Sequence, residues 1–121
     1  MNQKDKTILL KIMDYCLEIK DTHVYFNQNK ELFTNEKFTN EKAGFIYRNS
    51  ITMPILQIGE LSKMLSTEFL NEYTTIPWKM IMRMRDIVAH HYGSLDYEIV
   101  WNTSMSDIPE LYQGIKEILK E

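Results

Sequence analysis

Cysteine, glycine and proline are all scarce in this sequence, and each shortage narrows the kind of protein it can encode. A single cysteine, Cys16, among 121 residues excludes an intramolecular disulfide and a zinc site built from several thiolates. Cys16 lies at helical spacing from apolar residues, so we expect it to be a small core side chain. With four glycines, three prolines and no Asn-Gly or Asp-Gly pair, the chain has few of the turns that join β-strands. These shortages favour helices over strands.

Long apolar runs are missing as well. No stretch approaches the roughly 18 apolar residues that a membrane-spanning helix needs, and Lys11 and Asp14 interrupt the apolar run near the start. We therefore expect a cytoplasmic protein that does not enter a membrane. The net charge of −3 argues against a broad basic surface that coats nucleic acid. Residues 79–91 are nevertheless locally basic, which leaves room for a local nucleic-acid site.

What the sequence does contain is apolar residues at helical spacing. They predict a first helix over roughly 3–27 and a second from Glu41 to about Leu65, with Asn40 as its N-cap. A third helix is expected over 77–91, ending before Gly93, and a fourth from Asp96 to about Met105. Pro109 marks a new start or a kink, after which the chain is helical to its end.

Within this pattern, Pro54 should kink the second helix. The polar segment 27–44, in which "TNEK" occurs twice, is expected to be a loop or a short capped turn. Long helices with short connections predict one all-α domain over residues 1–121. Its expected architecture is an antiparallel up-down bundle of four main helices.

The segment "RDIVAHHY", from Arg85 to Tyr92, concentrates reactive side chains near the end of the third predicted helix. Asp86 and His90 are four residues apart, so on a helix the carboxylate can accept a hydrogen bond from the imidazole. His90 also lies in the last helical turn, where the carbonyl end of the helix favours a protonated imidazole.

An arginine beside a histidine is the minimal equipment for metal-free RNA cleavage. The imidazole of His90 would move a proton, and the guanidinium of Arg85 would stabilise charge on the phosphate. One chain supplies one such pair, so a symmetric dimer that joins two copies would supply both an acid and a base. The alternative is a plain helix surface, with an Arg–Asp ion pair and histidines that cap the helix end.

Other kinds of site are less favoured. Adjacent His90 and His91 point about 100° apart, which is poor geometry for a shared metal. No phosphate-binding glycine loop, dinucleotide fingerprint or G-x-S-x-G elbow is present, so no cofactor is expected. His23 is expected at the surface or the core boundary. Glu60 could face the site or pair with a basic residue inside the bundle.

Four further positions are interpreted by their place on helices. Trp78 and Trp101 are expected to anchor the core or a dimer interface. Arg48 and Asn49 lie on the second helix and are not assigned to the site.

The pattern Arg85, four residues, His90, one residue, Tyr92 matches the R-x(4–6)-H-x-Y signature of the HEPN superfamily. Asp86 supplies the polar residue that usually follows the arginine. The blocks "QIGELSKML" (57–65), "IPWKMIMRMRDIVAHHYGSLDYEIVW" (76–101) and "DIPEL" (107–111) resemble, in order and spacing, the HepT-like branch of that superfamily. The resemblance covers roughly residues 45–120.

This resemblance implies an all-helical homodimer whose motifs meet in a cleft at the interface. It also implies a metal-independent ribonuclease toxin, paired with an MntA-like minimal nucleotidyltransferase as antitoxin, which transfers AMP to the motif tyrosine. On this chain Arg85 and His90 would be catalytic and Tyr92 the modified residue. Asp86 and His91 would support the site, with His91 able to substitute for His90 or to face solvent. The alternative is a non-catalytic HEPN module that dimerises and binds a nucleotidyltransferase or a nucleotide.

Overall fold

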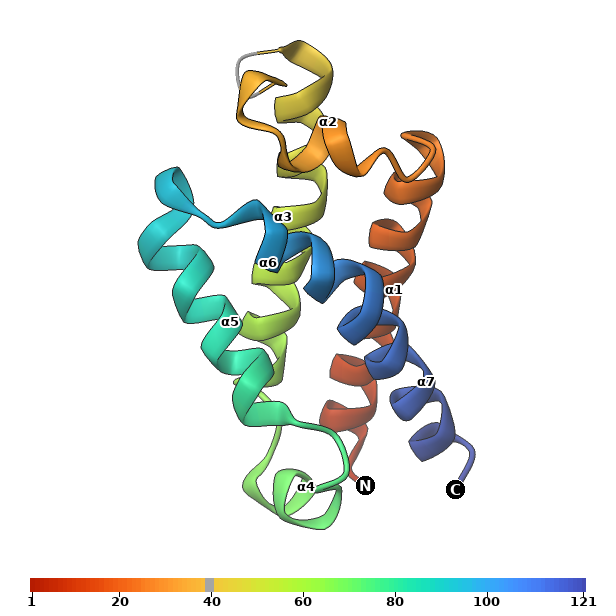
Figure 1. The fold of residues 1–121 in the computed structure, drawn as a ribbon. Coiled ribbons are helices and arrows are strands. Elements are labelled where there is room, and N and C mark those ends of the chain that lie inside the picture. The colour runs from red at the N-terminus through yellow and green to blue at the C-terminus, as the bar shows by residue number, and fades with distance from the viewer. Residues whose placement is uncertain (39–40) are drawn as a thin grey trace.

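Helices form nearly all of the regular structure in the computed structural model, which describes residues 1–38 and 41–121 (Figure 1). The elements are α1 (Gln3–Tyr25), α2 (Lys30–Thr34), the 3-10 turn η1 (Glu36–Phe38), α3 (Lys42–Ser62), α4 (Thr67–Glu72), α5 (Trp78–His91), the 3-10 turn η2 (Tyr92–Ser94), α6 (Tyr97–Asn102), the π-helical turn η3 (Thr103–Asp107) and α7 (Ile108–Leu119). Over these two ranges there is no β-strand, which confirms the predicted all-α fold. The expected N-cap, Asn40, falls outside the described residues.

Helix α3 is the centre of the bundle, because it packs against α1 on one side and against α5 on the other (Figure 1). Helix α7 packs along α1, and α2 crosses one end of the bundle, where it contacts α3 and α6. Consecutive long helices run in opposite directions, and both termini lie at the end that carries α4 (Figure 1). The up-down arrangement is therefore as predicted. Within the described part of the chain, none of the helices has both the length and the apolar character to cross a bilayer.

The core is built from one apolar stripe of each long helix. Cys16, Trp78 and Trp101 are all buried, which confirms their predicted core positions. Burying a large apolar side chain stabilises a fold by about 1.5–3 kcal/mol, so these stripes supply the main driving force for bundle assembly. The fully buried apolar side chains that dominate the centre are Leu9, Ile12, Ile19, Phe33, Tyr47, Ile51, Ile58, Val88, Val100 and Ile115.

The prediction for His23 is wrong, because this side chain is buried with only 4% of its surface exposed. Its Nδ1 lies 2.6 Å from the Tyr47 hydroxyl and its Nε2 lies 2.8 Å from Ser104 Oγ. Ser104 Oγ donates its own hydrogen to the carbonyl of Trp101, so it accepts from His23 Nε2–H. Nδ1 must then be the acceptor for the Tyr47 hydroxyl. Burial of this neutral ring lowers the pKa of His23 to about 4.

Two short helices occupy segments without a long apolar period. Helix α2, capped by Asn29, lies inside the polar segment expected to be a loop or a capped turn. Helix α4 was not predicted; Ser66 caps it by accepting from the Phe69 backbone N–H at 3.1 Å. Helix α1 ends two residues earlier than expected, because Asn27 and Gln28 adopt positive φ angles of 56° and 50°.

The last two predicted helices form one continuous helical segment. Helix α6 passes through the π-helical turn η3 directly into α7. Pro109 has no backbone N–H and its ring disfavours an α-helical bond to the residue four positions earlier. A π-helical turn just before Pro109 places the proline in the first turn of α7, where no such bond is required. The new start expected at Pro109 is thus present as the beginning of α7, which follows η3 without a break.

Candidate functional site

The site begins with a close contact between the central helix and α5. Gly59 of α3 lies directly against Arg85 of α5, and a Cβ added at Gly59 would overlap Arg85 Cβ. Only the absence of a side chain at residue 59 allows this approach. The stem of Arg85 is thus packed against the α3 backbone at Gly59, and Glu60 is the residue that follows Gly59.

Four charged side chains, including that of Arg85, interact with one another at this contact. Arg85 Nε donates to Glu60 Oε1, and Arg85 Nη1 donates to Asp86 Oδ1 at 3.0 Å. The same Asp86 oxygen accepts from Lys63 Nζ at 2.6 Å. We call Glu60, Lys63, Arg85 and Asp86 the ion cluster. It contains two positive and two negative groups, and it joins α3 to α5.

The ion cluster fixes the charge states of its members. Hydrogen bonds to Asp86 and Glu60 raise the pKa of Arg85, so the guanidinium stays positive. Hydrogen bonds from Lys63 and Arg85 lower the pKa of Asp86, so its carboxyl stays ionised. The side chain of Arg85 keeps 27% of its surface exposed.

The two histidines of the motif lie at the exposed end of α5. The expected hydrogen bond between Asp86 and His90 is not formed here, since Asp86 is engaged by Lys63 and Arg85. Across residues 1–38 and 41–121, neither imidazole has a recorded side-chain partner, and only the His91 carbonyl accepts, from Ser94 Oγ at 3.5 Å. The structure therefore presents His90 and His91 to solvent as unengaged groups.

Tyr92 begins η2 and turns back toward α3. Its hydroxyl donates to Asn49 Oδ1 at 2.6 Å, and 37% of the residue is exposed. Partial burial, together with the neighbouring Tyr97, raises the pKa of Tyr92, so its phenol is neutral near pH 7. Tyr92 is therefore a neutral, partly exposed phenol whose orientation is set by Asn49.

The partners of Arg85 and Tyr92 on α3 lie along one face of that helix. Asn49 and Glu60 lie along this stripe, and between them Met53 is 42% exposed. Phe45, one turn before Asn49, is 45% exposed. We call Phe45, Asn49, Met53, Leu56 and Glu60 the α3 stripe. It places exposed apolar surface directly beside the motif.

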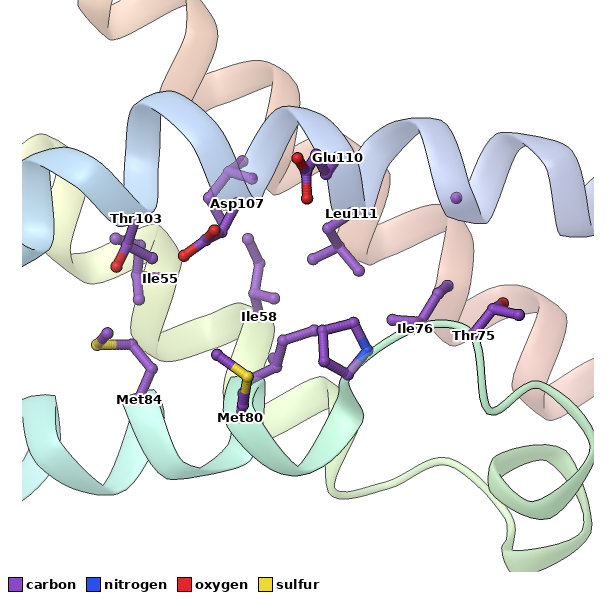
Figure 2. A pocket seen from close by; sticks show the side chains of 14 residues that line it. Ile55, Ile58, Thr75, Ile76, Met80, Met84, Thr103, Asp107, Glu110 and Leu111 are labelled. Atoms are coloured by element: carbon purple, nitrogen blue, oxygen red, sulfur yellow. The ribbon is translucent and has the colours of Figure 1, made fainter.

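A separate cavity of about 350 Å³ lies between α5 and α7, over the middle of α3 (Figure 2). Met80 and Met84 line its α5 side, while Asp107 of η3 and Glu110 of α7 lie along the opposite side (Figure 2). Arg85, His90 and Tyr92 are not among its lining residues. The cavity is therefore distinct from the motif. In the part of the chain that is described, no group of three or more His, Cys, Asp or Glu side chains could hold a metal ion.

Arg85 and His90 lie on the helix predicted to carry them, but most contacts of the motif were not predicted. Glu60 pairs with a basic residue, as one of the two alternatives held, and that residue is Arg85 itself. Asn49, which was not assigned to the site, contacts Tyr92. Arg48, its neighbour, is buried with its guanidinium 5.2 Å from the Tyr97 ring centre. A glycine inside a helical pattern was the available signal for the close approach at Gly59.

The fold and site define an all-α protein with an Arg–His–Tyr motif at the exposed end of one helix. The sequence model of one protein family, described as "Ribonuclease HepT-like", matches residues 14–118. The chain belongs to this ribonuclease HepT-like family.

Individual relatives agree with that assignment. "Putative RNase MJ1216" of Methanocaldococcus jannaschii is 32% identical over 116 residues, which cover 96% of this chain and 88% of the relative. "Putative RNase TTE0752" of Caldanaerobacter subterraneus subsp. tengcongensis is 44% identical over 64 residues, 53% of this chain and 57% of the relative. "Probable ribonuclease HepT" of Thermococcus cleftensis is 36% identical over 63 residues, 52% of this chain and 57% of the relative. The matches with the highest identity thus span about half the length of those curated relatives. No solved structure matches the chain at a comparable level.

Proposed function

We propose that this protein is a metal-independent endoribonuclease toxin in which Arg85 binds and stabilises the scissile phosphate and His90 moves the proton. The observation that carries the proposal is the charge of Arg85 and the lack of a recorded partner for His90 among the described residues, in a chain of the ribonuclease HepT-like family. Arg85 is permanently charged and partly exposed, and His90 is unengaged less than two turns further along the same helix.

The chemistry follows that of other metal-free RNA cleavages. One imidazole takes the proton of the 2′-hydroxyl, whose oxygen attacks the adjacent phosphorus. The bond from phosphorus to the 5′-oxygen breaks, and a second imidazole protonates that leaving oxygen. Arg85 neutralises the charge that builds on the phosphate oxygens.

A homodimer would supply the two imidazoles from two copies of His90. The α3 stripe supports this assembly, because it exposes Phe45 and Met53 beside the motif contacts of Asn49 and Glu60. Exposed apolar side chains next to a functional site are typical of an interaction surface.

Control of the toxin would act on Tyr92. An MntA-like nucleotidyltransferase antitoxin would transfer AMP from ATP to the Tyr92 hydroxyl, releasing pyrophosphate. Each AMP would place a bulky anion in the cleft meant for RNA and repel its phosphate. The exposure of Tyr92 and the orientation of its hydroxyl by Asn49 support this role.

The deciding experiment is RNA cleavage by the unmodified protein in the presence of EDTA, with total cellular RNA and a tRNA pool as substrates. Wild type should cleave, and the Arg85→Ala/His90→Ala double variant should not. Because both side chains are at least partly exposed, circular dichroism should show the same fold for both proteins. Equal cleavage by the two proteins would contradict the assignment.

A non-catalytic binding module in the cytoplasm is the second candidate, and one observation favours it. The charge of Arg85 is already balanced by Glu60 and Asp86 within the ion cluster. If the AMP-free wild type cleaves no RNA but forms a stable complex with the nucleotidyltransferase, the binding module becomes the better description.

A further inference from the structure

The guanidinium of Arg85 is held at two of its three nitrogens. Nε donates to Glu60 and Nη1 donates to Asp86. Among the residues that the structure describes, Nη2 has no recorded acceptor. This nitrogen carries two N–H bonds, so the available donors of Arg85 are concentrated at one end of the planar group.

Glu60 is the one of these two acceptors that belongs to another helix. Asp86 follows Arg85 on α5 and moves with it, whereas Glu60 sits on α3. Since the stem of Arg85 also rests on Gly59, α3 contacts both the stem and the head of this side chain. An unrestrained arginine would lose rotamer entropy on binding a phosphate, whereas a side chain already held in place would lose less.

We infer that Glu60 is a positioning residue, which holds Arg85 through Nε so that Nη2 faces the RNA phosphate. This rests on the ribonuclease function proposed above. The opposite role for Glu60 would be that of a competitor, which a phosphate must displace from Arg85. The geometry favours positioning, because a phosphate that binds at Nη2 need displace neither carboxylate.

The test compares Glu60→Ala with Glu60→Gln, which keeps an oxygen acceptor at the same reach. Glu98→Gln is the matched control, because Glu98 likewise joins two helices by pairing with a basic residue, in this case Lys30 at 3.2 Å, between α6 and α2. The first measurement is the NMR signal of the Arg85 Nε–H group. The chain has only Arg48, Arg83 and Arg85 as arginines, so the spectrum is simple to assign.

We expect the Arg85 Nε–H signal to shift in Glu60→Ala and to stay in place in Glu98→Gln. The kcat of RNA cleavage should fall about tenfold or more in Glu60→Ala, with a smaller change in KM, and Glu60→Gln should recover much of it. In an Arg85→Ala background, Glu60→Ala should cause no further loss, since Glu60 acts through Arg85.

Three results would overturn the inference. They are an unchanged Nε–H signal in Glu60→Ala, faster cleavage by either Glu60 variant, or additive losses from the Glu60 and Arg85 substitutions. A wild type that cleaves no RNA would instead overturn the proposed function. Binding of a non-cleavable 2′-O-methyl RNA then decides the role of Glu60: weaker binding by Glu60→Ala than by Glu60→Gln supports positioning, and equal binding overturns it.

Discussion

Arg85 and His90 belong to the same motif, but in the described part of the chain only Arg85 has its side chain held in place by neighbouring residues. The head of Arg85 is fixed by two carboxylates, while the imidazole of His90 projects into solvent without a recorded partner in residues 1–38 and 41–121. Arg85, the proposed phosphate-binding group, is thus held in position within one chain. His90, the proposed proton-transfer group, would be oriented only by RNA or by a second copy.

The first prediction separates the two adjacent histidines. His90→Ala should lower RNA cleavage by about 100-fold or more, the usual worth of a proton-transfer group. His91→Ala should cause a clearly smaller loss. Both residues are exposed, so each substitution should change the free energy of unfolding by less than about 0.5 kcal/mol. Initial cleavage rates at pH 7 decide the matter, and a larger loss in His91→Ala would exchange the two roles.

A second prediction concerns modification. Tyr92→Phe should accept no AMP from the nucleotidyltransferase with ATP, and should keep RNA cleavage that the antitoxin can no longer suppress. Intact-mass spectrometry gives the number of AMP groups on each protein. Tyr97→Phe is a suitable comparison, because Tyr97 lies near Tyr92 on the next helix but outside the motif. AMP on the Tyr92→Phe protein would refute the assignment of the target.

The close packing of α3 against α5 depends on a glycine, Gly59, at the point of contact. Gly59→Ala should destabilise the fold by about 1–3 kcal/mol, because the new methyl group collides with Arg85 Cβ and must push α5 away. Cleavage should fall as well, since Arg85 moves with α5. Gly93→Ala is the control: a Cβ at Gly93 meets nothing within 4 Å and its φ is not positive. Urea unfolding curves of the two variants should differ clearly, and equal midpoints would contradict the close packing.

The buried His23 joins α1, α3 and η3, and it makes their packing dependent on pH. Its pKa is about 4 in the folded state and about 6.5 when unfolded, so the unfolded chain binds a proton more readily. The stabilisation is complete above about pH 6.5 and is lost as pH falls toward 4, by on the order of 3 kcal/mol. His23→Gln should remove this part of the pH dependence, as measured by urea unfolding between pH 7.5 and 4.5. A variant that keeps the full wild-type slope would show that another group is responsible.

The long helices could be predicted from the sequence, whereas the short helix α4 and the tertiary contacts could not. Apolar spacing predicted the long helices because each buries a continuous stripe, whereas α4 has only the six residues Thr67–Glu72 and no complete period. His23 lies four residues after Ile19 on the same buried stripe, so its position was visible in the pattern. Its residue type misled the interpretation, since the Tyr47 and Ser104 partners that make burial tolerable come from distant segments. The contacts of Glu60 with Arg85 and of Asn49 with Tyr92 are likewise tertiary, and helical periodicity holds no information on them.

For the whole molecule, the proposed activity requires two copies of the chain. Met53→Glu should convert a dimer into a monomer, because it places a charge within the apolar part of the α3 stripe. Met64→Glu is the matched control, since Met64 is 53% exposed but lies beyond the end of α3. Light scattering at micromolar concentration reports the mass, and RNA cleavage should disappear together with the dimer. A monomeric Met53→Glu variant that still cleaves would show that one chain is sufficient.

The burial of Cys16 has a practical consequence for such measurements. Burial raises the pKa of its thiol to about 12, so almost none of the reactive thiolate exists at neutral pH. The folded protein should therefore resist thiol-directed reagents without any change to its sequence. A cysteine introduced at an exposed position such as Met64 would become the single site of labelling. A spin label or fluorophore there would report distances between two copies on an otherwise native background.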